Sequence, residues 1–245
     1  MNTKIEQLTQ ILKESKNIVF FGGAGVSTES NIPDFRSSNG LWNENLKINF
    51  TPEQLVSHTF FMKYPYEFFK FYKDKLIYPE ARPNTAHMAL AKLEDIGKLK
   101  AIVTQNIDGL HQAAGSKVVY ELHGSVLRNY CMKCHAFYDE KFILASKGIP
   151  TCPKCGEKVK PDVVLYEEGL DEAIIQNSVK AISQADTLII GGTSLVVYPA
   201  AGLINYFRGN NLVLINKSTT SADNKADLVI HDSIGKVLYE AVKSL

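Results

Sequence analysis

The sequence predicts an α/β fold in which helices wind over both faces of a parallel sheet. Short apolar runs rich in β-branched residues recur along the chain, and near-continuous apolar runs are typical of strands buried on both faces of a parallel sheet. Segments of helical periodicity separate these runs, and such alternation is typical of doubly wound folds. Two stretches break the alternation, and they predict a second, smaller lobe.

The expected elements follow in order from the N-terminus. Met1 to Ser15 forms an amphipathic helix, because its apolar residues recur on one face. Strands are expected at Ile18–Phe21, Ala101–Thr104, Val118–Leu122, Val163–Leu165, Leu188–Ile190, Leu212–Ile215 and Leu228–Ile230. Further helices are expected at Thr85–Ile96, Asp171–Gln184, Tyr198–Phe207 and Ile234–Lys243.

The two interrupting stretches are interpreted as insertions. Residues 40–83 are rich in aromatic side chains at helical spacing, and residues 126–160 contain the cysteines. The remaining segments, 1–39, 84–125 and 161–245, form the large domain. Because ligands bind preferentially at domain interfaces and at the carboxyl ends of strands, we expect the ligand site between the two lobes.

Composition limits the classes of partner. The 245 residues are 45% hydrophobic, and 27 basic residues balance 26 acidic ones to a net charge of +1. A nucleic-acid-binding protein usually has a basic surplus, so we expect no nucleic-acid partner and favour a protein or a small molecule. No apolar run approaches the ~18–20 residues that cross a bilayer. The N-terminal helix lacks the features of a signal peptide, so the expected location is cytoplasmic, without membrane attachment.

The cysteines predict a zinc site. They occur as two C-x2-C pairs separated by 17 residues: Cys131, Cys134, Cys152 and Cys155. Four thiolates complete a tetrahedral Zn²⁺ site with no open coordination position, so the metal is expected to be structural. A thioredoxin-like redox pair is the alternative, but it does not explain two pairs at this spacing.

The first strand runs into a glycine-rich turn, Gly22-Gly-Ala-Gly-Val-Ser-Thr28. Such a turn lets the backbone approach a pyrophosphate closely. The dinucleotide-binding motif is incomplete, because Thr28 stands where its third glycine is expected, and a simple tight turn is the alternative. Arg36 follows the turn and is suited to pair with phosphate or carboxylate.

Polar residues follow several other predicted strands. Ala101–Thr104 runs into Gln105-Asn-Ile-Asp-Gly109, which either binds a ligand or forms a turn. Gln105 is not needed for a turn and favours a ligand site. His123 follows the next strand and is suited to act as a general base near neutral pH. Together with Gly192-Thr-Ser194 and Asn216, these strand ends predict one extended site.

The combination resembles the sirtuin family of NAD-dependent protein deacylases, over essentially the full chain. The matching motifs, in addition to the cysteines, are Gly23-Ala-Gly-Val-Ser27, Ile32-Pro-Asp-Phe-Arg36, Thr104-Gln-Asn-Ile-Asp108, His123-Gly124, Lys160-Pro-Asp-Val-Val164 and Gly192-Thr-Ser-Leu195. The resemblance implies a Rossmann-type NAD-binding domain, with a smaller lobe made of a helical insert and a structural zinc ribbon.

The resemblance also implies residue roles. His123 is the general base and, with Asn106, forms the catalytic set. The NAD site comprises Gly23, Ala24, Gly25, Thr28, Phe35, Arg36, Gln105, Asn106, Ile107, Asp108, His123, Thr193, Ser194 and Asn216. Phe35 covers the nicotinamide, and Ile107 and Asp108 hold its carboxamide. The substrate peptide pairs as an added strand with Val164, Tyr166, Leu195 and Val196.

The implied activity is removal of acyl groups from lysine side chains of proteins or peptides, with NAD as co-substrate and one structural zinc. His123 takes a proton from the ribose diol, and the products are free lysine, nicotinamide and O-acyl-ADP-ribose. Two alternatives remain. One is a protein ADP-ribosyltransferase that uses the same site, and the other is a non-catalytic zinc-ribbon binding module. The near-neutral charge and the series of polar strand ends count against the second.

The chain departs from the family pattern at three positions. Asn31 stands where the family usually has glycine, and asparagine tolerates a left-handed backbone. Lys160 replaces an arginine. Glu167 replaces a glycine beside the presumed peptide site, where we hypothesise that it favours basic flanking residues or weakens binding. Phe69-Lys-Phe-Tyr72 lacks the Tyr-x-x-Arg pair of family members that prefer succinyl or malonyl lysine, so a neutral acyl group such as acetyl is favoured.

Overall fold

A six-stranded parallel sheet forms the centre of the computed structural model, which describes residues 2–35, 40–41 and 50–245. Its strand order is β3-β2-β1-β7-β8-β9, which confirms the predicted doubly wound class. The strands are β1 (Ile18–Gly22), β2 (Leu99–Thr104), β3 (Val119–Glu121), β7 (Thr187–Gly191), β8 (Asn211–Ile215) and β9 (Leu228–Ile230). The order reverses between β1 and β7, and ligands of such sheets bind beyond the carboxyl ends of the strands at this point.

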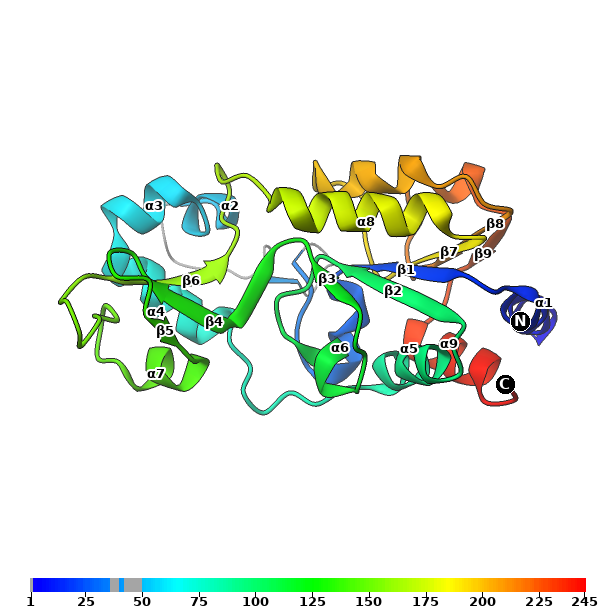
Figure 1. Ribbon diagram of the computed structural model, residues 1–245, viewed down its shortest axis with the longest axis horizontal. Coiled ribbons are helices and arrows are strands. Elements are labelled where there is room, and N and C mark those ends of the chain that lie inside the picture. The colour runs from blue at the N-terminus through cyan, green and yellow to red at the C-terminus, as the bar shows by residue number, and fades with distance from the viewer. Residues whose placement is uncertain (1, 36–39, 42–49) are drawn as a thin grey trace.

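Helices cover both faces of the sheet (Figure 1). One face carries α1 (Asn2–Glu14), α5 (Thr85–Asp95) and α9 (Ile234–Val242), and the other carries α8 (Glu172–Gln184) and the 3-10 segment η4 (Ala200–Tyr206). Side chains of β1 alternate between the two cores, because successive residues of a strand point to opposite faces. Phe20 packs in the core that contains Leu8 and Leu90, and Phe21 packs in the core that contains Ile182.

Four short helical elements lie in the loops between the strands and helices of the parallel sheet domain. They are η1 (Ala24–Val26), η2 (Thr28–Ser30), α6 (Leu110–Ala113) and η5 (Asp223–Lys225). Asn31, which ends η2, has φ 62° and ψ 23°, so it takes the left-handed conformation for which asparagine is suited. Within the described ranges, no helix has both the length and the hydropathy needed to cross a membrane.

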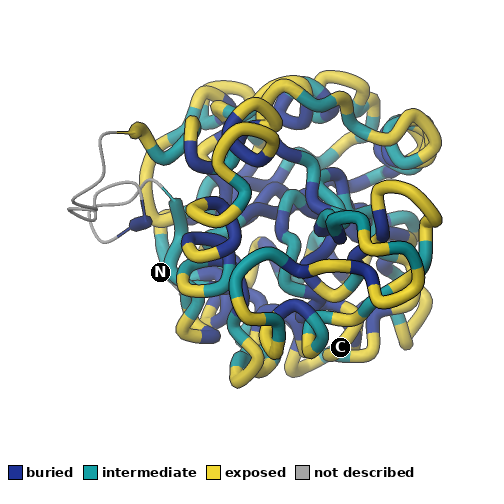
Figure 2. The backbone as a smooth tube through the Cα atoms, turned by 90° about the vertical axis from the view of Figure 1, so that its left-hand side faces the viewer, coloured by how far each residue is buried: buried dark blue, intermediate teal, exposed yellow. Residues whose placement is uncertain are grey.

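A smaller unit lies at the end of the molecule opposite α1 (Figure 1). It contains α2 (Pro52–Leu55), α3 (His58–Lys63), α4 (Pro65–Lys75), β4 (Gly124–Cys131), β5 (Phe137–Tyr138), α7 (Glu140–Ala145) and β6 (Val159–Val163). Its three strands form an antiparallel sheet of order β5-β4-β6. The unit has its own aromatic core around Phe61, Phe68, Phe69 and Tyr72, each fully buried. Viewed from this end, buried segments gather in the interior and exposed segments lie on the outside (Figure 2).

One element prediction was wrong. The apolar run Val163–Leu165 is not a strand of the parallel sheet, because the strand there is β6, which ends at Val163 and pairs antiparallel with β4. The helix predicted at Tyr198–Phe207 is present over Ala200–Tyr206, and it is of the 3-10 type. An apolar pattern indicates burial, whereas the pairing partner and the hydrogen-bond pattern depend on the surrounding fold.

Candidate active site

The predicted site residues follow strands that end at the same edge of the parallel sheet. Gly22, the last residue of β1, lies opposite Thr104 of β2 and Gly191 of β7. Thr104 in turn lies opposite Glu121, the last residue of β3. The loops that carry the predicted NAD-binding residues therefore leave the sheet side by side, as their strand-end positions predict.

Two glycine loops contact each other backbone to backbone. The Gly25 amide donates to the Gly192 carbonyl oxygen at 2.8 Å. A Cβ atom on Gly25 would lie 2.8 Å from the Gly192 Cα, and one on Gly23 would lie 2.9 Å from the Thr193 Cβ. Gly192 also has φ +59°, a conformation that favours glycine. The tight turn after β1 and the turn after β7 therefore both require glycine.

Polar side chains from three loops form a network of two separate hydrogen-bonded groups. The Gln105 amide donates to the Thr193 hydroxyl at 3.0 Å. The Asn106 amide donates to the Ser27 hydroxyl at 3.1 Å, and Ser27 donates to the Asp108 carboxylate at 2.7 Å. Ser27 is 1% exposed and Asn106 is 8% exposed, so these bonds satisfy buried groups. The network holds the Asn106 and Asp108 side chains in fixed orientations.

Ser27 is a site residue to which the sequence analysis assigned no role. It lies in the glycine-rich turn, but its partners Asn106 and Asp108 lie 79 and 81 positions away. Its only sequence signal is a small hydroxyl residue directly after the glycines, which a simple turn also explains.

His123 lies between β3 and β4, half-buried. Its Nδ1 is 3.0 Å from the Gln105 carbonyl oxygen. Because a carbonyl can only accept a hydrogen bond, Nδ1 carries the proton and the neutral ring presents Nε2 as a proton acceptor. Burial lowers the pKa of His123 below its ordinary value, although the bond to Gln105 acts in the opposite direction. The imidazole is therefore neutral at pH 7 and suited to act as a base.

Two buried imidazoles lie close to the Asp108 loop. His87 of α5 and His111 of α6 are 0% and 1% exposed, with ring centroids 4.8 Å apart. Burial lowers the pKa of His87 to about 4 and that of His111 to about 3. The nearby Asp108 carboxylate raises the pKa of His87 in part. Both rings are therefore neutral in the folded protein near pH 7.

The other predicted NAD-site residues that the structure describes belong to the segments that follow β1, β2, β7 and β8. Ala24 is half-buried in the first loop, and the Thr28 hydroxyl donates to the Gly25 carbonyl at 3.0 Å. Phe35 and Ile107 pack against the core of the small unit. Ser194 is exposed in the turn after β7, and Asn216 follows β8. Arg36 lies outside the described residues.

The predicted peptide-binding residues flank His123 and Thr193. The Val164 amide donates to the His123 carbonyl at 3.1 Å, and the Leu195 amide donates to the Thr193 hydroxyl at 3.2 Å. Leu195 is buried with φ 55°, whereas Val196 is 55% exposed and Tyr166 is 38% exposed. The structure thus brings Val164 and Leu195 next to residues of the predicted NAD site.

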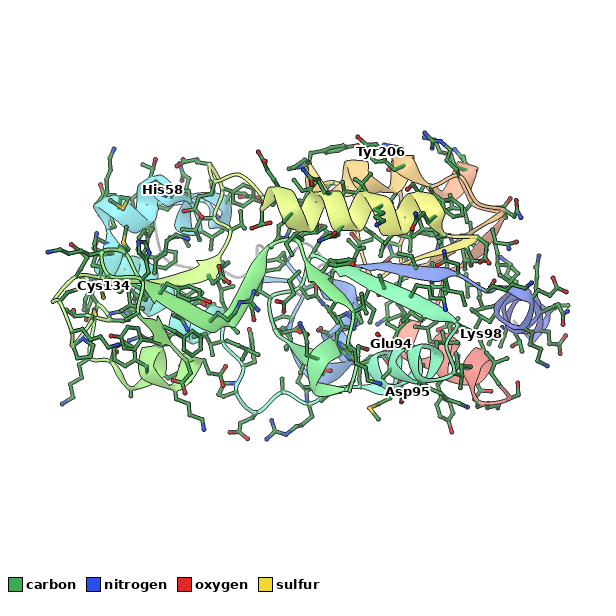
Figure 3. All side chains as sticks on the ribbon, in the orientation of Figure 1. His58, Glu94, Asp95, Lys98, Cys134 and Tyr206 are labelled. Atoms are coloured by element: carbon green, nitrogen blue, oxygen red, sulfur yellow. The ribbon has the colours of Figure 1, made fainter. Side chains whose placement is uncertain are left out.

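The four cysteine sulfurs gather at the far end of the small unit, where Cys134 is labelled in Figure 3. All four atoms lie within 4.8 Å of one another, and pairs of them are 3.3 to 3.6 Å apart. These separations are too long for a disulfide. They approach the spacing of about 3.8 Å that a tetrahedral set of Zn–S bonds implies. The cluster therefore fits one structural zinc ion.

Comparison with known proteins gives consistent matches. The model of the Sir2 family matches residues 23–199. A relative from Clostridium perfringens, named NAD-dependent protein deacetylase, is 75% identical over 243 residues, which cover 99% of this chain and 100% of the relative. A relative of the same name from Clostridium acetobutylicum is 67% identical, over 98% of each chain.

Solved structures resemble the whole chain as well. A Sir2 enzyme in complex with a p53 peptide and NAD⁺ superposes with a TM-score of 0.86 at 37% identity, over 98% of each chain. A Sir2 homologue in complex with NAD also has a TM-score of 0.86, at 38% identity, and covers 98% of this chain and 93% of that one. The likeness therefore includes both the large unit and the small unit.

Proposed function

The chain belongs to the Sir2 family and is an NAD-dependent protein deacetylase, and we propose that His123 is its general base. One observation carries this proposal. The His123 ring is anchored through Nδ1 to the Gln105 carbonyl, which leaves Nε2 unprotonated and the imidazole neutral at pH 7. A proton acceptor in this state is what removal of a proton from a sugar hydroxyl requires.

The mechanism assigns further roles to residues around His123. Bound NAD supplies a ribose carbon, from which nicotinamide leaves as the acyl-lysine carbonyl oxygen attacks. We propose that Asn106 and Asp108 orient the nicotinamide ribose and its carboxamide, because Ser27 holds both side chains. Phe35 and Ile107 exclude water from this position, since both pack against the apolar core of the small unit. His123 would then take the proton of a ribose hydroxyl, whose oxygen attacks the acyl carbon. The acyl carbon–nitrogen bond breaks, the lysine amine leaves with a proton, and one water molecule adds to complete the O-acyl-ADP-ribose product.

The rest of the NAD site is proposed along the sheet edge. Gly23, Ala24, Gly25, Thr28 and Arg36 would bind the pyrophosphate side, Gln105 would contact the nicotinamide ribose, and Thr193, Ser194 and Asn216 would bind the adenosine half. Backbone amides of glycine turns at strand ends are suited to a pyrophosphate. The zinc ion, held by the four cysteines, would stabilise the small unit, because four thiolates leave no open coordination position for catalysis.

Acyl-lysine proteins or peptides are the proposed second substrate. The Sir2 structure with a bound p53 peptide supports this class of substrate. We propose that the peptide pairs between the segment containing Val164 and Tyr166 and the segment containing Leu195 and Val196. A neutral short acyl group is preferred, and neither a membrane nor a nucleic acid is involved. We further propose a cytoplasmic location, because four cysteines kept as thiolates suit a reducing compartment.

The His123→Ala variant tests the proposed base. We expect NAD-dependent deacetylation of an acetyl-lysine peptide to fall by at least about a hundredfold, with zinc content and circular dichroism unchanged. The control is His135→Asn, since asparagine tolerates the φ of 56° at this position, which lies in the small unit and outside the network described above. Retained turnover in His123→Ala would remove this residue from the catalytic role.

A further inference from the structure

The segment that follows β6, residues 164–168, is hydrogen-bonded to the start of α3. Tyr166 forms a parallel bridge with Ser57. The Tyr166 amide donates to the Val56 carbonyl at 3.0 Å, and the His58 amide donates to the Tyr166 carbonyl at 3.0 Å. At its other end the segment contacts the His123 turn through the Val164 amide. It therefore connects the helical insert to the proposed base.

The same segment supplies hydrogen-bond acceptors for the free N–H groups at the N-terminus of α3. The first N–H groups of a helix have no partner within the helix. In α3 the His58 amide binds the Tyr166 carbonyl, the Thr59 amide binds the Glu167 carboxylate at 2.8 Å, and the Phe60 amide binds the Ser57 hydroxyl at 3.1 Å. Two of the first three N–H groups of α3 thus have partners in segment 164–168.

Glu168 adds a third attachment. One of its carboxylate oxygens lies 2.9 Å from His58 Nδ1, and the other accepts from Lys160 Nζ at 3.0 Å and from the Leu165 amide at 2.9 Å. His58 is labelled on α3 in Figure 3, beside the chain that leaves β6. Three consecutive residues, 166 to 168, therefore contact two neighbouring residues of α3.

Glu167 takes a backbone conformation that glycine adopts more readily. Its φ is 76°, which is unfavourable for residues with a Cβ atom. Only a side chain can reach the Thr59 amide, so glycine at this position would relieve the backbone and lose the bond. The hydrogen bonds with Thr59 hold the pKa of the Glu167 carboxyl below its ordinary value, so the group is ionised at neutral pH.

We propose that Glu167 is a positioning residue that holds segment 164–168 against α3, ready to pair with the substrate peptide. This inference rests on the proposed function, because it assumes that the segment binds the peptide. It replaces the hypothesis that Glu167 recognises basic residues of the substrate, since its carboxylate binds the Thr59 amide. An ordered segment binds more tightly because less conformational freedom is lost on binding.

Steady-state kinetics of the zinc-loaded full chain test the proposal. In Glu167→Gly we expect KM for a neutral acetyl-lysine peptide to rise about threefold to tenfold, the range that one hydrogen bond accounts for. The kcat and KM for NAD should stay within about twofold of wild type. Glu167→Gln should restore most of the peptide KM, because a glutamine oxygen accepts from the same amide. Glu172→Gln is the matched control, because it removes an exposed carboxylate at the start of α8.

Hydrogen exchange of the Thr59 amide gives a readout that does not depend on activity. Exchange should be faster in Glu167→Gly than in wild type or Glu167→Gln. Unchanged peptide KM and unchanged exchange in Glu167→Gly would overturn the proposal. So would a Glu167→Gln variant that loses only a preference for lysine-flanked peptides, because the carboxylate would then contact substrate directly. Absence of deacetylation in the wild type would instead refute the proposed function, whatever the exchange result.

Discussion

The substitution Gly192→Ala tests whether the close contact between the two glycine loops is needed for stability and for NAD binding. A Cβ atom at Gly192 would lie 2.4 Å from the Val26 amide nitrogen and 2.7 Å from the Gly25 carbonyl carbon. Both neighbours are backbone atoms that cannot rotate away. The two loops must therefore separate by about 1 Å to restore ordinary contact distances. This movement breaks the bond from the Gly25 amide to the Gly192 carbonyl.

The expected loss of stability follows from two effects. Alanine at φ +59° is unfavourable by about 1–2 kcal/mol. The Gly25 amide left without a partner adds about 1–3 kcal/mol. We therefore expect Gly192→Ala to lower the free energy of unfolding by about 2–5 kcal/mol, as measured by urea denaturation. Calorimetry should also show that the dissociation constant for NAD rises at least about tenfold, because the displaced loop carries the amides proposed to bind the pyrophosphate.

Gly97→Ala is the matched control. Gly97 has φ +77° but no atom within 4 Å of an added Cβ, so alanine there meets the unfavourable φ without crowding. We expect a loss of about 1–2 kcal/mol from the unfavourable φ alone, and unchanged NAD affinity. Equal destabilisation of the two variants, or wild-type NAD affinity in Gly192→Ala, would refute the role of the close loop contact.

Three further predictions concern the zinc cluster, an ion-pair network and the buried imidazoles. Chelation of the metal, or the substitution Cys152→Ser, should release one zinc ion per chain, as measured by atomic absorption. The melting temperature should fall as well, as measured by thermal unfolding. A zinc-free protein of unchanged stability would contradict the structural role of the metal. Arg128→Met should lower the free energy of unfolding by roughly 1–3 kcal/mol in urea denaturation, because the 9%-exposed Glu121 carboxylate loses its cationic partner at 2.7 Å and keeps only the hydrogen bond from Gln112. Arg128→Lys should recover part of this loss. The free energy of unfolding should fall as the pH drops below about 6.5, the ordinary pKa of histidine in the unfolded chain. The fall should continue towards the folded pKa values of about 4 for His87 and about 3 for His111. Within this pH range the unfolded chain binds more protons than the folded protein does. His111→Leu should weaken this dependence, and an unchanged slope between about pH 7 and about pH 5 would count against the buried neutral pair.

The framework of the fold could be predicted because its signals are local. The strands β1, β2, β7 and β8 are apolar runs, and all five residues of β1 and of β7 are buried. The same reasoning failed for β4, which was not predicted as a strand. Its residues mix burial with exposure, and its partners are a two-residue strand and β6, so no periodic pattern reveals it.

For the candidate site, the sequence could predict only which residues follow the ends of strands. Gln105, Asn106 and His123 were predicted as site residues because polar residues follow predicted strands, although β2 is largely buried and β3 is only half-buried. Their partners could not be predicted, since Gln105 binds Thr193 across 88 positions. The attachment of Glu167 to Thr59 was also missed, because it depends on the orientation of a helix start 108 positions away. The residue pattern within one segment does not predict which distant residues tertiary packing brings into contact with it.

Product analysis tests the central claim most directly. The protein is incubated with NAD and an acetyl-lysine peptide, and mass spectrometry then quantifies both sets of products. We expect deacetylated peptide, nicotinamide and O-acetyl-ADP-ribose in equal amounts, with no ADP-ribose attached to protein. NAD left intact, or ADP-ribose transferred to protein while the peptide stays acetylated, would contradict a deacetylase in which His123 activates the ribose hydroxyl.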